Sequence, residues 1–147
     1  MSHKDSFMAD QRGAVAFEML IVFFFMGVSL LLPLADVAIA GFRYVSAWQA
    51  LRAFGQNIQY KPPPDVTDWA GWNSALPTSV AGYPINNLQL LCGDTNAACS
   101  AGNSAPPMSY SYTTTVTFAP ILLTRALCTS SNANPCSFTL RHSERFQ

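Results

Sequence analysis

The sequence has few charged side chains and almost no histidine. Lys and Arg together number 8, as do Asp and Glu, so the formal net charge is zero. Without a basic excess, the chain lacks the electrostatic attraction on which nucleic-acid binding depends. Its two histidines, His3 and His142, stand at opposite ends, and no Ser-His-Asp set, carboxylate pair, phosphate-binding loop or metal motif is evident. The sequence therefore predicts a protein that is not an enzyme and has no cofactor, metal, nucleic-acid partner or small-molecule substrate.

What the chain has instead is one long apolar run near its N-terminus. Between Ala14 and Ala35 the single charged residue is Glu18. As a helix this run reaches about 33 Å at about 1.5 Å per residue, enough to cross a hydrocarbon core of about 30 Å. Because lipid offers no partners to backbone polar groups, the run is predicted to be helical.

Glu18 is an expensive residue to place in such a helix. Insertion scales assign roughly 2.5 to 3.5 kcal/mol to an acidic residue at the centre of a spanning helix, and the cost falls near an interface. One interpretation is that the carboxylate reaches the lipid headgroups. The other is that it meets a positive partner in another chain.

The residues around Glu18 resemble a known processing and assembly signal. Gly13 precedes a small residue, Glu18 is the fifth residue after that glycine, and a long apolar helix follows, as in type IV-like prepilins. The form Arg-Gly-Ala-Val-Ala-Phe-Glu over residues 12–18, with Pro33 late in the span, is most similar to TadE-like minor pilins (pseudopilins) of the tight-adherence, or Tad, pilus. The later segment Phe-Ala-Pro-Ile-Leu-Leu, after a strand rich in Tyr and Thr, also resembles the C-terminal part of these proteins.

The resemblance implies that a prepilin peptidase cuts between Gly13 and Ala14. The new amine of Ala14 and the carboxylate of Glu18 on a neighbouring subunit would then form an assembly charge pair, which removes an unpaired charge from the apolar core of a filament. The chain divides accordingly into a cleaved leader (1–13), a transmembrane and assembly helix (14–36), a periplasmic continuation (37–60) and a small periplasmic domain (61–147).

The resemblance also implies a structural role in initiating, capping or regulating a Tad-type adhesive pilus. The expected partners are the prepilin peptidase, other major and minor Tad pilins, and the inner-membrane assembly platform. The expected location is the bacterial inner membrane, with a single span and the C-terminal domain in the periplasm, from which the subunit enters an extracellular pilus.

Two alternatives stay open. A pseudopilin of a secretion or DNA-uptake system uses the same helix signal. In addition, Ala38-Ile39-Ala40 before Gly41 fits the small-x-small rule of signal peptidase, and a cut after Ala40 would release a secreted binding domain. The apolar run is longer than the usual core of about 7 to 15 residues in such signals, so the prepilin interpretation is favoured.

The helix is predicted to continue beyond the membrane as far as the prolines at 62–64. Pro33 should kink it or mark its emergence from the membrane. Asp36 is interpreted as a solvated interface residue, with packing or pairing inside the filament as the alternative. Further along, apolar residues at spacings of three and four give one stripe, which faces either the chain's own domain or neighbouring subunits. The stripe consists of Tyr44 or Val45, Trp48, Leu51, Phe54 and Ile58.

Residues 61–147 are predicted to form a small, loop-rich α+β domain. Residues 108–118 alternate aromatic or branched side chains with Ser and Thr, which is typical of a strand with one apolar face. Residues 138–143 form a second strand by the same pattern. The two strands are expected to pair antiparallel and to pack on the stripe of the long helix. Smaller predicted elements are a short helix within 65–76 whose Trp69 and Trp72 join the core, a strand at 88–92, and an apolar turn or helix at 121–127.

All four cysteines lie beyond the apolar run, at Cys92, Cys99, Cys128 and Cys136. An even number outside the cytoplasm indicates disulfides, and four cysteines allow three pairings. The two local pairings are favoured, since each would tie a loop rich in Gly, Asn and Ser. A zinc site is disfavoured because exported thiols usually oxidise. The expected fold is thus α+β, with a long N-terminal helix on a small antiparallel sheet and disulfide-tied insertions.

Overall fold

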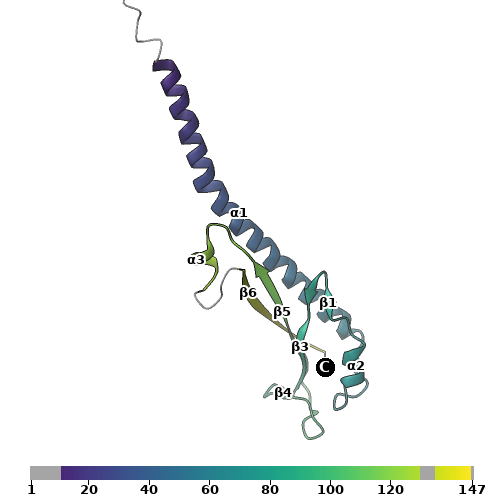
Figure 1. Cartoon of the computed structure of the whole chain (residues 1–147). Helices are drawn as coiled ribbons and strands as arrows, with labels where there is room; N and C mark the ends of the chain where they lie inside the picture. The colour runs from purple at the N-terminus through teal and green to yellow at the C-terminus, as the bar shows by residue number, and fades with distance from the viewer. Residues whose placement is uncertain (1–10, 130–134, 147) are drawn as a thin grey trace, which may run out of the picture.

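A single long helix, α1 (Gln11–Gln59), forms the axis of the molecule, and its 49 residues include Pro33. The computed structural model describes residues 11–129 and 135–146, so residues 1–10 of the expected leader lie outside the described part (Figure 1). Figure 1 shows the N-terminal part of α1 projecting alone, while its C-terminal part lies along a sheet. The predicted long continuous helix is confirmed.

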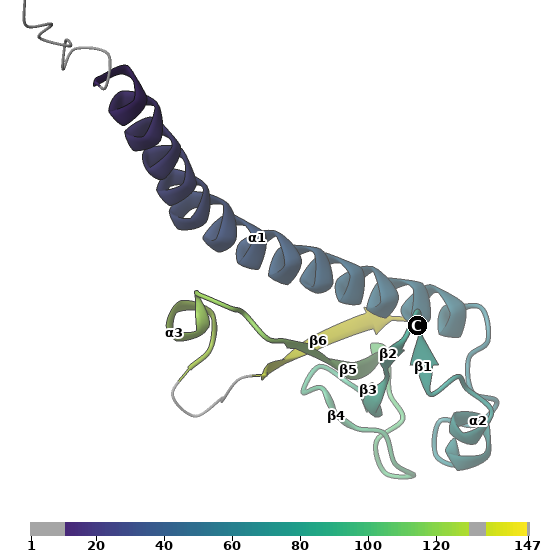
Figure 2. The same ribbon diagram turned by 45° about the horizontal axis from the view of Figure 1, so that its top comes forward.

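A four-stranded antiparallel sheet of order β4-β3-β5-β6 lies against the C-terminal part of α1 (Figure 2). Its strands are β3 (Asn86–Cys92), β4 (Ala97–Ala98), β5 (Met108–Phe118) and β6 (Cys136–Arg145). The β5–β6 pairing is unbroken, from Ser109 opposite Arg145 to Phe118 opposite Cys136. The predicted antiparallel pair is therefore confirmed, and the fold is α+β.

Three short elements complete the domain. The helix α2 (Ala70–Ser74) lies within the predicted segment 65–76, and α3 (Thr124–Leu127) follows β5. The strands β1 (Ser79–Val80) and β2 (Tyr83–Pro84) form a hairpin. Its two turn residues, Ala81 and Gly82, both have positive φ (51° and 83°), as the twist of a two-residue hairpin requires.

The core forms where one side of α1 meets the inner face of the sheet. Its fully buried members are Leu51, Phe54, Ile58, Leu90, Tyr110 and Tyr112. The rings of Phe54 and Tyr112 meet edge to face at 5.0 Å, and the Tyr112 hydroxyl donates a hydrogen bond of 3.0 Å to the carbonyl of Leu51. Burial raises the pKa of the Tyr110 phenol to about 12. Half of this core comes from α1, so the sheet cannot bury its inner face without the helix.

The predicted stripe on α1 packs on the chain's own domain at its C-terminal end, whereas at its N-terminal end packing against neighbouring subunits stays a prediction. Tyr44 and Val45 are 51 % and 52 % exposed, and Trp48 lies at the margin of the interface. Ala47 and Ala50 are buried instead, at 0 % and 3 %. The small side chains face the strands because they let the helix backbone come close, whereas larger residues there would hold it away.

The two tryptophans near α2 pack on the core, as predicted. Trp69 and Trp72 are half-buried against it. The Trp72 ring stacks on Tyr110 with 5.7 Å between centroids, and its indole N–H donates a hydrogen bond of 2.7 Å to the carbonyl of Lys61. Trp72 therefore joins α2 both to the sheet and to the chain leaving α1.

Gly55 lies where α1 and the sheet are closest. A Cβ atom on this residue would meet a carboxylate oxygen of Glu144 and the hydroxyl of Tyr112. The Tyr112 hydroxyl cannot move aside without losing its hydrogen bond to Leu51. Position 55 therefore requires glycine, which has no side chain, although glycine is a poor helix former.

We predict that Gly55→Ala destabilises the domain by about 1 to 3 kcal/mol, because overpacking outweighs the gain of about 1 kcal/mol in helix propensity. Denaturant unfolding of the full chain in detergent, followed by near-ultraviolet circular dichroism, measures the change. Gly41→Ala is the matched control, since no heavy atom lies within 4 Å of its Cβ. Equal stability changes in the two variants would contradict the close approach at Gly55.

Candidate membrane and assembly surface

The N-terminal part of α1 has the length and composition of a membrane span. Within Val15–Gln59, an 18-residue window is apolar enough and has few enough charged residues to cross a membrane, and none of that window is buried. From Val15 to Ala35 no side chain is buried, and Phe23, Phe24 and Phe25 are each at least 70 % exposed. The core helix of a soluble protein would bury one side. This segment exposes apolar side chains on all sides, as a helix surrounded by lipid or by other helices does.

The polar groups of this segment fit an apolar surrounding. No charged residue stands between Glu18 and Asp36. The Ser29 hydroxyl donates a hydrogen bond of 2.8 Å to the carbonyl of Phe25, one turn earlier. A hydroxyl satisfied within its own helix can lie in lipid at little cost.

The residues of the expected processing and assembly signal lie at the start of α1. The backbone of Gly13 and Ala14 is helical, and Glu18 follows on an exposed position. Among the residues that the structure describes, no ion pair includes Glu18.

The helix continues through Pro33 without a break. Figure 2 shows α1 curving between its projecting part and the part that lies along the sheet. Proline removes one helical hydrogen bond and crowds the carbonyl four residues earlier, which bends a helix. Pro33 supplies a physical cause for the curve, and the helix does not end there.

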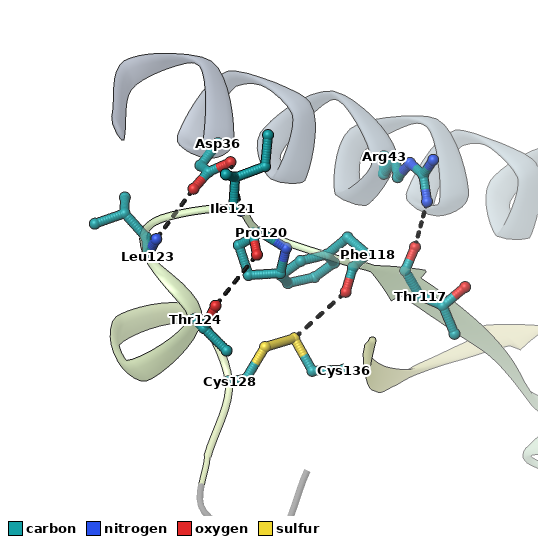
Figure 3. The surroundings of a disulfide bond; sticks show 10 residues. All are labelled: Asp36, Arg43, Thr117, Phe118, Pro120, Ile121, Leu123, Thr124, Cys128 and Cys136. Carbon is teal, nitrogen blue, oxygen red and sulfur yellow. Dashed lines mark hydrogen bonds between the residues drawn. A yellow bond between two sulfur atoms is a disulfide. The ribbon is translucent and has the colours of Figure 1, made fainter. Parts of the chain in front are cut away.

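Asp36 is not a solvated residue, and that interpretation was wrong. It is 5 % exposed, and its carboxylate accepts hydrogen bonds from three successive backbone N–H groups after β5. The distances are 3.0 Å from Ile121, 2.7 Å from Leu122 and 3.0 Å from Leu123, and Figure 3 draws the bond from Leu123. Its partners belong to a loop of the same chain, and the alternative role inside a filament stays a prediction. Asp36 thus fixes the β5–α3 loop to the end of the apolar segment.

Arg43 makes a second connection between α1 and β5. Its guanidinium donates a hydrogen bond of 2.6 Å to the carbonyl of Thr117, as Figure 3 shows. The carbonyl of Arg43 accepts one of 3.2 Å from the hydroxyl of Tyr83 in the β1–β2 hairpin. Asp36 and Arg43, about two turns apart on α1, therefore hold the loop after β5 and the end of β5 itself against the helix.

Two disulfides close the loops of the domain. Cys92 at the end of β3 pairs with Cys99, and Cys128 after α3 pairs with Cys136 at the start of β6. These are the two local pairings that the sequence favours. The second bond, drawn in Figure 3, connects the chain that follows the Asp36-bound loop directly to the sheet. Residues 130–134 between these cysteines lie outside the described part.

Both charged side chains that line one cleft of the domain are bound to backbone groups. A cleft of about 270 Å³ lies between α1 and the chain after β5, and both Asp36 and Arg43 line it with their charges bound to backbone groups. His142 lies on the edge strand β6 and is partly buried. Its ring packs against Trp48 and Tyr112, and its Nε2 atom lies 3.4 Å from the carboxylate of Glu144. Within residues 11–129 and 135–146, no three His, Cys, Asp or Glu residues gather as a metal site would require.

Comparison with protein-family models, with curated proteins and with solved structures found no match for this chain. Sequence reasoning found the apolar segment and Glu18. It missed the role of Asp36, for which the available signal was a carboxylate placed at the last turn of an apolar run.

We predict that Asp36→Ala releases the β5–α3 loop from α1, because three backbone N–H groups lose their acceptor at once. Hydrogen exchange at Ile121, Leu122 and Leu123 should become faster by roughly an order of magnitude, while exchange in the centre of β5 changes little. Mass spectrometry or NMR of the full chain in detergent measures both.

Asp65→Ala is the control for this experiment. Asp65 accepts hydrogen bonds from the backbone N–H and the hydroxyl of Thr67, and these bonds lower the pKa of its carboxyl group. The variant also removes a carboxylate that accepts backbone hydrogen bonds, but in another loop. If it accelerated exchange at residues 121–123 equally, the effect of Asp36 would not be local.

Proposed function

We propose that this chain is a TadE-like minor pilin that enters a Tad-type adhesive pilus as a structural subunit. One observation carries the proposal: α1 exposes apolar side chains on every side for the length of a membrane and then packs a domain on its second half. A filament subunit needs both properties. The first half is held in the membrane before assembly and among other helices after it, while the domain remains in water.

Glu18 is the residue through which the subunits would associate during assembly. In lipid, a carboxylate without a partner is costly, and Glu18 has no partner among the described residues. Cleavage after Gly13 would create an amine at Ala14, four residues before Glu18. When two such helices lie side by side with a small shift, the amine of one can reach the carboxylate of the other. That contact favours assembled subunits over isolated ones, because only assembly pairs the buried charge.

The length of the chain supports a minor subunit. The major pilins of Tad systems are short, and the sheet and its disulfide-tied loops add a domain beyond a simple helix. As a minor pilin, the subunit would initiate, cap or regulate the filament. It would be processed by the prepilin peptidase in the inner membrane, with its domain in the periplasm. A pseudopilin of a secretion or DNA-uptake system would use the same surface.

A domain released after Ala40 is disfavoured by the packing of α1. Ala40 and Gly41 lie inside the helix, between Asp36 and Arg43. A cut there would remove Asp36 from the domain and leave the N–H groups of Ile121, Leu122 and Leu123 without their acceptor. Signal peptidase sites normally lie outside the folded domain that they release, and this one would break a buried contact.

We predict that Glu18→Ala inserts in the membrane and is processed normally but assembles poorly. Removing the carboxylate lowers the cost of lipid exposure and leaves the amine of Ala14 without its partner. Recovery of partner pilins with the tagged variant from native membranes should fall by about tenfold or more.

Glu18→Gln is the matched variant, since it keeps the size and hydrogen-bonding capacity of the side chain and loses only its charge. It should behave like Glu18→Ala. Normal recovery of partner pilins with both variants would refute a role for the charge.

We predict that Gly13→Leu blocks removal of residues 1–13, because a prepilin peptidase must bring the backbone before the cut into a narrow site. The intact mass and N-terminal sequence of the protein from its native membrane provide the readout, with Ala14 as the first residue of the unmodified protein. Gly27→Leu is the control, because space is open around its Cβ and it lies within the apolar segment. A mature chain that begins at Gly41 would contradict the proposed processing.

A further inference from the structure

We propose that the β5–α3 loop is a second membrane contact, with Ile121 and Leu122 entering the boundary between lipid headgroups and acyl chains. Ile121 is 74 % exposed and Leu122 is 50 % exposed. Within the described residues of 61–146, no other large apolar side chain is exposed to this extent. The inference rests on α1 crossing the membrane, as in the proposed function, and adds a lipid-facing surface to the domain itself.

The bonds to Asp36 set the depth of this loop. Asp36 is the first charged residue after the apolar segment, so it marks the level at which α1 leaves the hydrocarbon. The N–H groups of Ile121 and Leu122 lie 3.0 Å and 2.7 Å from its carboxylate. The two apolar side chains therefore start from the same level of the bilayer as the end of the span. At that level they reach either headgroups or the outer ends of acyl chains.

The rest of the domain lies on the other side of this level. Figure 2 shows the chain around α3 beside the curve of α1, whereas α2 lies near the C-terminal end of the helix. In Figure 3 the Ile121 side chain lies alongside α1, and the Leu123 side chain points toward the N-terminal side of the helix. With the projecting part of α1 across the bilayer, the loop is the part of the domain that comes nearest to the lipid.

The charges of the loop also suit a lipid interface. The carboxylate of Asp36 is buried and bound by three N–H groups, so it is shielded from the surface. Arg125 in α3 is exposed and basic. Exposed apolar residues together with a cation form the composition that binds at the boundary of anionic bilayers. A neighbouring subunit is the other occupant to consider, but no feature of the loop specifies one, whereas its depth specifies lipid.

The test uses the full chain in vesicles and a nitroxide spin label at residue 121. All four cysteines of the sequence are paired in disulfides, so Ile121→Cys supplies a single free thiol. Collision rates with oxygen, which concentrates in lipid, and with a water-soluble nickel chelate report the depth of the label. Leu20→Cys provides the lipid reference, and Ala75→Cys at the exposed end of α2 provides the water reference.

We expect the label at residue 121 to collide more with oxygen than with the nickel chelate. Its two collision rates should be closer to those of the label at residue 20 than to those of the label at residue 75. This result should hold at every protein-to-lipid ratio. Nickel accessibility at 121 equal to that at 75, with 20 in lipid, would overturn the loop contact and leave the proposed function intact. Low collision rates with both reagents that rise on dilution with lipid would show a neighbouring copy over the loop, and would also overturn it. Water-like labels at both 20 and 121 would overturn the span and the loop contact together.

Discussion

The close approach of α1 to the sheet is the contact on which the rest of the structure depends. Small residues make it possible: Ala47, Ala50 and Gly55 lie on the side of the helix that faces the strands. At this distance the Tyr112 hydroxyl reaches a carbonyl of the helix itself. The core then fills the remaining space with Leu51, Phe54 and Ile58. Because the sheet uses the helix as half of its core, the domain and the apolar segment are joined by a stiff element instead of a linker.

Much of the fold follows from the sequence because its signals are local. Apolar and polar residues alternate in β5 and β6 with the period of a strand, and the apolar segment is long enough to indicate a membrane span by its length alone. The cysteine pairs are also close in sequence. The role of Asp36 could not be predicted in this way, because its partners are backbone N–H groups about 85 residues later. Every residue except proline has such a group, so the sequence does not show which ones Asp36 binds. Ala47 and Ala50 were missed because alanine is compatible with either side of a helix.

The candidate site likewise has one part that the sequence predicts and another that depends on tertiary structure. Residues 13–18 form a compact motif that can be read from the chain, but the proposed partner of Glu18 belongs to another molecule and no single chain can display it. The surface beyond the motif depends on tertiary structure. Ile121 and Leu122 look like ordinary core residues in the sequence, and only their position after β5 and their bonds to Asp36 place them on the outside at the end of the apolar segment.

The disulfide between Cys128 and Cys136 has a mechanical consequence. Tension applied along the apolar segment of α1 reaches the domain first through Asp36 and Arg43, which are the contacts between helix and domain nearest to that segment. The chain that Asp36 holds continues through α3 to Cys128, and the covalent bond passes the force to the first residue of β6. There it is shared by the ten paired positions of β5 and β6. Strands loaded along their length must break several hydrogen bonds together before they slide, so the domain resists a pull on its helix more than its small core alone would allow.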